Sequence, residues 1–357
     1  MNLKSDILNI IKSGTKAPSG DNLQPWRFEV SGNVISIFHR EEILSGPIDR
    51  LSEATNVTYG ALIENMVIAS DHYGYDANVT YFPDESDPWR IADICLVENS
   101  EDKGVRLFEY IEKRVTDRRP YQTLSLDSSV LDEISELSQS LENDMRLIVL
   151  DNKAKIRIIA RLITLQLKIT FSNKPFHHEF FGSLRWNKRS AIRTKDGLDA
   201  ITLELNLAKQ FLFRYILGVW PIVNFLNKFG IADLAAKLEE SRYMQAGAYI
   251  AIVSKNHQPS DYVKAGQLFE RLWLVLTRAG LSAQPAFSSI LIKQVLDVAP
   301  SLFGADEIDL VCDVTEEYRE IFAVKDNEHI MCIMRVGKTE GEPRRSFRKE
   351  PEVVFKN

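Results

Sequence analysis

The chain has 357 residues, of which 45% are hydrophobic and 26% are charged, and its formal net charge is −6. This length exceeds what one compact core usually holds, so we expect two domains or two fused subdomains. The negative charge argues against a general nucleic-acid partner, and the three isolated cysteines indicate neither a disulfide framework nor a zinc site.

The chain begins with an amphipathic helix, whose apolar members are Leu3, Ile7, Leu8, Ile10 and Ile11. A stiff polar corner, Ala17–Trp26, follows it and leads into an alternating strand at 27–30 and a hairpin at 31–33. Two prolines and a glycine shape this corner, which presents Ser19, Asn22 and Gln24. The corner predicts either one wall of a site for a flat polar ligand or a plain helix-to-strand turn.

Two later stretches, 60–74 and 266–280, share a spacing of small and acidic residues. Each begins with glycine, has Glu four residues on and ends with glycine ten residues further. The apolar positions between also match, so each predicts a buried helix that ends at a glycine. Strands are expected downstream at 91–97 and 330–336. We interpret the pattern as an internal duplication, with chance similarity of two buried helices as the alternative.

The duplication predicts two halves, at 1–105 and 106–357, that keep complementary parts of one site. The second half has its own helix near residue 130 and a strand at 145–150, but no polar corner joins them. It carries instead a basic segment around residues 114–118 that the first half lacks. We therefore expect one composite site at the interface between the halves.

Arg114, Thr116 and Arg118 alternate, so an extended backbone directs them to one side. Two guanidiniums around a hydroxyl suit a phosphate, because Arg offers paired donors. A solvated basic loop is the alternative. Near the chain end, Arg344 and Arg345 belong to a second basic cluster. Two such clusters in an acidic protein favour a bound phosphate.

An aromatic-rich helical insert is expected at about 165–245. Residues 211–226 within it are apolar, but Pro221 interrupts them and they are shorter than the roughly 20 residues of a bilayer span. We expect two short helices meeting at Trp220–Pro221, in the core or in a mobile cap, with an interfacial membrane helix as the alternative. The first residues lack the pattern of a signal peptide, so a cytoplasmic protein without a membrane partner is expected.

These motifs resemble those of the nitroreductase superfamily of FMN-dependent oxidoreductases. Arg114–Arg118 is similar to its Arg-x-Ser-x-Arg motif, with Thr in place of Ser, and the corner is similar to its Pro-Ser-x-x-Asn-x-Gln-Pro-Trp segment. Residues 266–281 resemble the helix that precedes the backbone amides near flavin N5. The chain most resembles the Acg-like branch, in which two protomer folds are fused around one flavin site.

The resemblance implies an α+β, nitroreductase-like fold. Its two pseudo-symmetric halves would each have a mostly antiparallel sheet flanked by helices, as in a fused dimer. The resemblance also implies bound FMN, with NADH or NADPH as transient electron donor. The acceptor would be a nitroaromatic, a quinone or an unknown small molecule. A flavin-sequestering protein with little turnover and a flavin oxidase acting on a peptide-derived heterocycle are the alternatives.

The expected cofactor contacts are Pro18, Ser19, Asn22, Gln24, Arg114, Thr116, Arg118, Ser282, Ala283, Arg344 and Arg345. No catalytic side chain is expected, because the flavin performs the chemistry. Arg185 or Lys188 could supply positive potential near flavin N1. No metal is expected at His177–His178, since adjacent helical residues face different directions. The chain would act as a pseudo-dimeric monomer or as a homodimer.

Overall fold

The computed structural model describes residues 3–43, 46–99, 107–139 and 144–356. Helices and antiparallel sheets are mixed along the chain, so the predicted α+β class is confirmed. The elements up to residue 99 are α1 (Leu3–Gly14), β1 (Trp26–Ser31), β2 (Val34–His39), α2 (Glu53–His72), β3 (Tyr75–Tyr81) and β4 (Arg90–Glu98). The strands predicted at 27–30 and 91–97 lie within β1 and β4.

The later elements form a second sheet, the helices around it and a short final strand. They are α3 (Phe108–Ile111), α4 (Ser128–Gln139), β5 (Met145–Leu150), β8 (Ala248–Ser254), α11 (Pro259–Arg278), β9 (Ser282–Pro285), α12 (Ser288–Val298), α13 (Ala305–Ile321), β10 (His329–Gly337) and β11 (Val353–Phe355). The strands predicted at 145–150 and 330–336 correspond to β5 and β10.

A helical insert separates β5 from β8. It contains α5 (Lys153–Ser172), α6 (Lys174–Ser183), β6 (Leu184–Arg185), α7 (Lys188–Thr194), β7 (Leu198–Asp199), α8 (Leu207–Leu212), α9 (Trp220–Leu226) and α10 (Ile231–Met244). The predicted break at Trp220–Pro221 is confirmed, because Pro221 lies in the first turn of α9, where no helical hydrogen bond is lost. None of the helices within the described ranges is both long and apolar enough to cross a bilayer.

The two sheets have the same topology. The first sheet has the order β11-β1-β2-β4-β3 and the second has the order β5-β8-β10-β9. Along the chain, each sheet takes two strands, then a long helix, then the remaining two strands. The strand order is therefore the same in both sheets when β1, β2, α2, β3 and β4 are matched with β5, β8, α11, β9 and β10. An internal duplication predicts this agreement.

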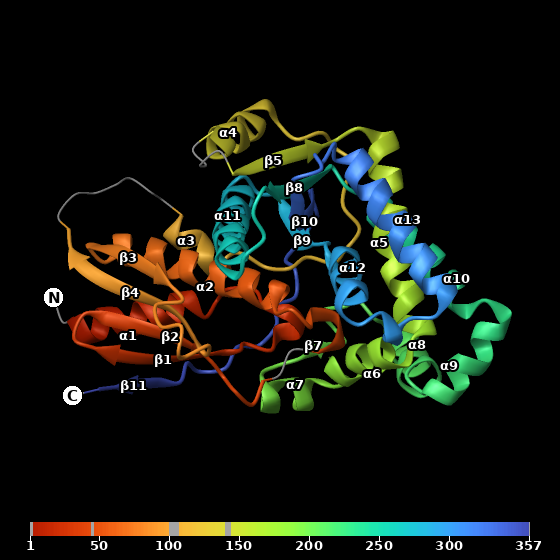
Figure 1. The fold of residues 1–357 in the computed structure, drawn as a ribbon, viewed down its shortest axis with the longest axis horizontal. Coiled ribbons are helices and arrows are strands. Elements are labelled where there is room, and N and C mark those ends of the chain that lie inside the picture. The colour runs from red at the N-terminus through yellow and green to blue at the C-terminus, as the bar shows by residue number, and fades with distance from the viewer. Residues whose placement is uncertain (1–2, 44–45, 100–106, 140–143, 357) are drawn as a thin grey trace.

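The last strand, β11, departs from this symmetry. It pairs in parallel with β1, with Phe28 opposite Val353 and Val30 opposite Phe355. The end of the chain, which the predicted boundary assigns to the second half, therefore lies at the edge of the first sheet (Figure 1).

Helices α2 and α11 adjoin each other in the middle of the molecule (Figure 1). Leu62 and Met66 of α2 pack into the core of the first sheet, and Leu268 and Leu272 of α11 pack into that of the second. The two helices thus join the two cores.

Glycines make this helix contact possible. A Cβ on Gly60 would lie 2.0 Å from the carbonyl oxygen of Val263, and a Cβ on Gly266 would lie 2.1 Å from that of Val57. Each glycine therefore faces a backbone carbonyl of the other helix, and that carbonyl belongs to the residue three positions before the other glycine. The shared glycine spacing of the sequence marks one pseudo-symmetric crossing point.

Polar pairs across the same contact repeat the symmetry. The Nδ2 of Asn65 donates to Glu270 Oε1 at 3.0 Å, and the Nε of Arg271 lies 2.5 Å from Glu64 Oε1. Glu64 and Asn65 occupy the positions in α2 that Glu270 and Arg271 occupy in α11. Both glutamates are buried, and a buried carboxylate requires such partners.

We expect Gly60→Ala and Gly266→Ala each to lower the free energy of unfolding by about 1–3 kcal/mol or more, because the added methyl overlaps a backbone oxygen. This loss should outweigh the gain of about 1 kcal/mol that Ala brings to a helix. In Gly182→Ala, the matched control, the methyl meets nothing within 4 Å, so stability should be unchanged or slightly raised. Urea denaturation measures the free energy of unfolding of all three variants. A Gly60→Ala protein as stable as the wild type would contradict the close helix contact.

Candidate functional site

The segment Arg114–Arg118 lies against β9. Thr116 pairs with Ala283 in an isolated parallel bridge, and the backbone N–H of Asp117 donates to the carbonyl of Ala283 at 3.2 Å. Two parts of the chain that the sequence assigns to one site are thus adjacent.

Asp117 links this segment to β9 and to the start of the C-terminal tail. This tail is the chain at 338–352, which connects β10 to β11. Its Oδ2 accepts from Arg119 at 2.7 Å, Thr339 at 2.8 Å and Ser282 at 2.9 Å. Burial alone raises the pKa of Asp117, but hydrogen bonds from Arg119, Thr339 and Ser282 outweigh it and lower the pKa to about 2. The Ser282 hydroxyl, a predicted cofactor contact, is therefore committed to an ionised carboxylate.

Arg114 is buried in an ion pair. Its Nε lies 2.9 Å from Glu270 Oε1, its Nη2 donates to the carbonyl of Lys16 at 2.5 Å, and its guanidinium stands 4.5 Å from the centre of the Trp273 ring. Burial raises the pKa of Glu270, and the charge of Arg114 counteracts this rise. The charge of Arg114 is compensated within the protein, and the residue links α11 to the start of the corner.

The two tail arginines have different partners. Arg345 donates to the carbonyls of Glu112 and Lys113, each at 2.6 Å, and so caps the chain just after α3. Arg344 is exposed and donates to the carbonyl of Ile201 in the insert at 3.2 Å. Of the two, Arg344 keeps more of its donor capacity for another group.

The corner holds the tail through its two amides. Asn22 donates to the carbonyl of Phe347 at 3.1 Å and accepts from Arg348 at 2.6 Å. Gln24 accepts from the backbone N–H of Lys349 at 2.8 Å. Both amides are buried, so in this structure their polar atoms bind the protein itself.

The corner also contacts the insert. Gln24 Nε2 donates to the carbonyl of Lys195 at 2.7 Å, while the Ser19 hydroxyl accepts from the backbone N–H of Gln24 at 3.1 Å. Asp21, Asn22 and Gln24 have φ values of 47°, 56° and 56°, a region that non-glycine residues occupy at a cost. The contacts to tail and insert offset this strain. Pro18 is half-buried beside them.

Arg118 differs from the other predicted arginines in its hydrogen bonding. Within the described ranges its guanidinium has no hydrogen-bond partner, although burial lowers its pKa and the side chains of Tyr243 and Asp21 are close enough to act on it. The Arg118 side chain is half-buried, so its guanidinium has lost part of its hydration without gaining a hydrogen bond in return. Arg118 is therefore the predicted residue best suited to an anionic ligand.

Gln284 on β9 is a second unsatisfied group beside it, and the sequence reasoning gave it no role of its own. Its Nε2 lies 3.4 Å from the Tyr243 hydroxyl, whereas its buried Oε1 has no hydrogen-bond partner. In the tail, the buried Nε of Arg348 also lacks a partner. The sequence placed Gln284 beside the expected flavin ring and Arg348 in the second basic cluster, but it did not predict that these atoms would lack partners.

Four carboxyl groups gather where the corner meets α2 and α6: Asp21, Asp49, Glu53 and Glu179. Burial is the main cause that raises the pKa of each, to about 7 for Glu53 and Glu179. The carboxylate of Asp49 adds to the rise at both glutamates. No sequence motif predicted this cluster, because its members come from three separate segments.

Three other candidate residues take structural roles. Arg185 forms an ion pair with Asp196 at 2.7 Å, and Lys188 begins α7 at the surface. The Nε2 of His177 lies 2.7 Å from the carbonyl oxygen of Leu217. No group of potential metal ligands occurs among the described residues.

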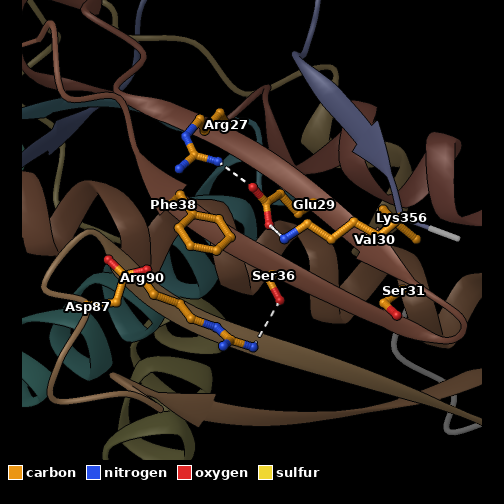
Figure 2. A pocket seen from close by; sticks show the side chains of 9 residues that line it. All are labelled: Arg27, Glu29, Val30, Ser31, Ser36, Phe38, Asp87, Arg90 and Lys356. Atoms are coloured by element: carbon orange, nitrogen blue, oxygen red, sulfur yellow. Dashed lines mark hydrogen bonds and ion pairs between the residues drawn. The ribbon is translucent and has the colours of Figure 1, made fainter.

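A hollow of about 320 Å³ lies on the first sheet (Figure 2). Arg27 and Arg90 flank the ring of Phe38 in it. Arg27 and Lys356 both pair with Glu29, so its charges are largely compensated. None of the predicted cofactor contacts lines this hollow. A second, of about 530 Å³, is lined by residues 120–124 and Gln245 and directly follows the Arg118 segment along the chain.

We expect Asp117→Asn to lower the free energy of unfolding at neutral pH by about 1.5–3 kcal/mol, since three donors lose a charged acceptor. The folded pKa of about 2 lies below the ordinary value of 3.8. Ionised Asp117 therefore stabilises the fold above about pH 4, and this contribution disappears as the pH falls toward 2.

Denaturation at pH 7, 4 and 2.5 should show the difference between wild type and Asp117→Asn shrinking with acidity. Asp132→Asn, on the exposed face of α4, should follow the wild type throughout. A difference that stays constant with pH would contradict the assigned network.

No protein-family model matches the chain. "Putative NAD(P)H nitroreductase MT3217" of Mycobacterium tuberculosis (strain CDC 1551 / Oshkosh) is 29% identical over 116 residues, 32% of this chain and 34% of that protein. "Putative NAD(P)H nitroreductase acg" of the same strain is 28% identical over 117 residues, 32% of this chain and 35% of that protein. The chain thus spans about a third of the length of these relatives.

A solved nitroreductase with bound FMN from Desulfitobacterium hafniense DCB-2 is 14% identical, with a TM-score of 0.34 over 67% of this chain and 92% of that one. This structural likeness is too low to add to the fold described above. The two curated matches confirm that the chain is similar to nitroreductases of the Acg-like branch, the resemblance that its motifs predict.

Proposed function

We propose that the chain is an FMN-dependent oxidoreductase, which takes electrons from NADH or NADPH and passes them to a small-molecule acceptor in the cytoplasm. The observation that carries this proposal is the guanidinium of Arg118, which has no hydrogen-bond partner in the part of the chain that the structure describes. It lies where the corner, the Arg114–Arg118 segment, β9 and the insert come together. The names of the curated relatives support the same class of reaction.

The donor set at this junction fits the phosphate and the polar ring edge of FMN. Arg118 and exposed Arg344 offer charge-assisted donors to a phosphate. Thr116 lies between Arg118 and Arg114 in the sequence, and Gln284 adds a buried acceptor without a partner. We assign these side chains, with Pro18 and the backbone of Ala283, to direct cofactor contact.

The other predicted contacts hold these groups in position. Arg114 fixes the segment through Glu270, Arg345 fixes the tail to the end of α3, and Asn22 with Gln24 fixes the tail to the corner. Ser19 braces Gln24, and Ser282 braces Asp117. When bound, FMN itself supplies the hydride and electron transfer.

A flavin-sequestering protein is the second candidate, and the contact between corner and insert favours it. Gln24 bonds to Lys195 of the insert, and the tail occupies the amides of the corner. These contacts would restrict the entry of a nicotinamide. The two candidates therefore differ in access to the cofactor and share the same site.

Anaerobic mixing with NADH or NADPH separates the two candidates. For the oxidoreductase, the flavin absorbance near its visible maximum should bleach within seconds of mixing with at least one nicotinamide. Reduction by dithionite alone would favour sequestration. A folded protein that is colourless and takes up no added FMN would overturn both candidates.

We expect Arg118→Ala to weaken FMN binding by about 1.5–3 kcal/mol, or roughly 10- to 150-fold, since one charge-assisted phosphate contact is lost. Arg157→Ala, on the exposed face of α5, is the control and should bind FMN as the wild type does. Flavin fluorescence during titration measures both. Equal affinities in the two folded variants would remove Arg118 from the proposed site.

A further inference from the structure

The outer surface of the insert is unusually apolar. Of 21 large hydrophobic side chains that are exposed in the described chain, ten lie between residues 207 and 238. They are Leu207, Phe211, Leu212, Tyr215, Val219, Ile222, Phe225, Phe229, Leu234 and Leu238. Leu207 is 84% exposed and Phe229 is 75% exposed. A concentration of this kind marks a surface that binds a partner.

These side chains follow helical spacing along three consecutive helices. Leu207, Phe211 and Tyr215 recur every fourth residue along α8 and the helical turn after it. Ile222, Phe225 and Phe229 follow the three- and four-residue steps of α9 and the turn after it, and Leu234 and Leu238 do the same on α10. Each helix thus has an exposed apolar stripe.

The stripes are additional to the faces that these helices already bury. Leu217, Val223 and Ala232 pack with Phe171 of α5 in a separate small core. The inner contacts of the insert are therefore satisfied, and the exposed stripes are not needed to hold its helices to the rest of the protein. Their side chains are exposed, and α8 and α9, which carry several of them, lie at the edge of the molecule (Figure 1).

The exposed charges among the stripes are mainly positive. Between residues 207 and 238 the exposed charged residues are Lys209, Arg214, Lys228, Lys237 and Asp233. Asp233 is the acidic one, and it is paired with Lys168 at 2.9 Å. The protein as a whole is acidic, with a net charge of −6, so this basic surface is local. Long basic side chains can reach outward from an apolar surface to anionic groups.

We propose that this surface of the insert binds reversibly to the face of a membrane that contains anionic lipid. The apolar stripes would enter the interfacial region, and the basic side chains would contact lipid phosphates. The helices would lie on the membrane, because they have 6, 7 and 14 residues, whereas a span needs roughly 20.

Charge favours lipid over a second copy of the chain. A symmetric dimer through this surface would bring the same basic residues close to one another, and like charges across an interface oppose association. An anionic bilayer instead offers both an apolar phase and the opposite charge. This proposal departs from the sequence-based expectation of no membrane partner, and it does not depend on the proposed flavin chemistry.

Flotation with vesicles tests the proposal. The wild-type protein should float with vesicles of phosphatidylcholine and phosphatidylglycerol, bind pure phosphatidylcholine much less, and be released in part by salt. The Phe211→Ser/Phe229→Ser variant should bind at least tenfold more weakly. Lys228→Glu/Lys237→Glu should lose the preference for phosphatidylglycerol.

Leu51→Ser/Val298→Ser removes two exposed apolar side chains elsewhere and should bind vesicles as the wild type does. Circular dichroism and thermal unfolding confirm that each variant is folded. Absence of vesicle binding by the wild type would overturn the proposal. A wild-type dimer in light scattering that Phe211→Ser/Phe229→Ser dissociates would overturn it too, in favour of a second copy.

Discussion

The close contact between α2 and α11 is the constraint on which the rest of the structure depends. Two backbones can approach this closely only where a helix has no Cβ, and Gly60 and Gly266 provide the two gaps. The approach buries Glu64 and Glu270, and each finds a partner on the opposite helix. Packing and electrostatics are therefore coupled, since neither pair can form unless the glycines meet.

The same contact determines where the candidate site lies. Glu270 has a second partner, Arg114, which in turn binds the carbonyl of Lys16 next to the corner. Removal of Arg114 would leave the buried Glu270 carboxylate with only the neutral amide of Asn65, which is far more costly than the net worth of the ion pair. The motif residue Arg114 is thus explained by its position between α11 and the corner, whereas Arg118 has no such ion-pair partner among the described residues.

The motif resemblance predicted the α+β class, local periodicity predicted the positions of β1, β4, β5 and β10, and the glycine spacing predicted the duplicated helix pattern. The partners of the predicted site residues could not be predicted, because they depend on tertiary contacts between distant segments. Asp21 and Glu179, for example, become neighbours only when the insert folds against the corner. Similarly, β11 has three residues, and its parallel pairing with β1 leaves no local signal.

The position of the tail gives the polar corner a second role. At one end the tail is held by Lys338 beside Gln122, and at the other by β11 on the first sheet. The chain between these anchors must pass the corner, where Asn22 and Gln24 bind it. This part of the tail carries Arg344, which contacts the insert, and Arg348, which contacts Asn22. The corner therefore determines where these two positive charges lie. The corner, whose residue pattern resembles a flavin-contacting segment, would therefore act on the proposed cofactor through the tail it holds.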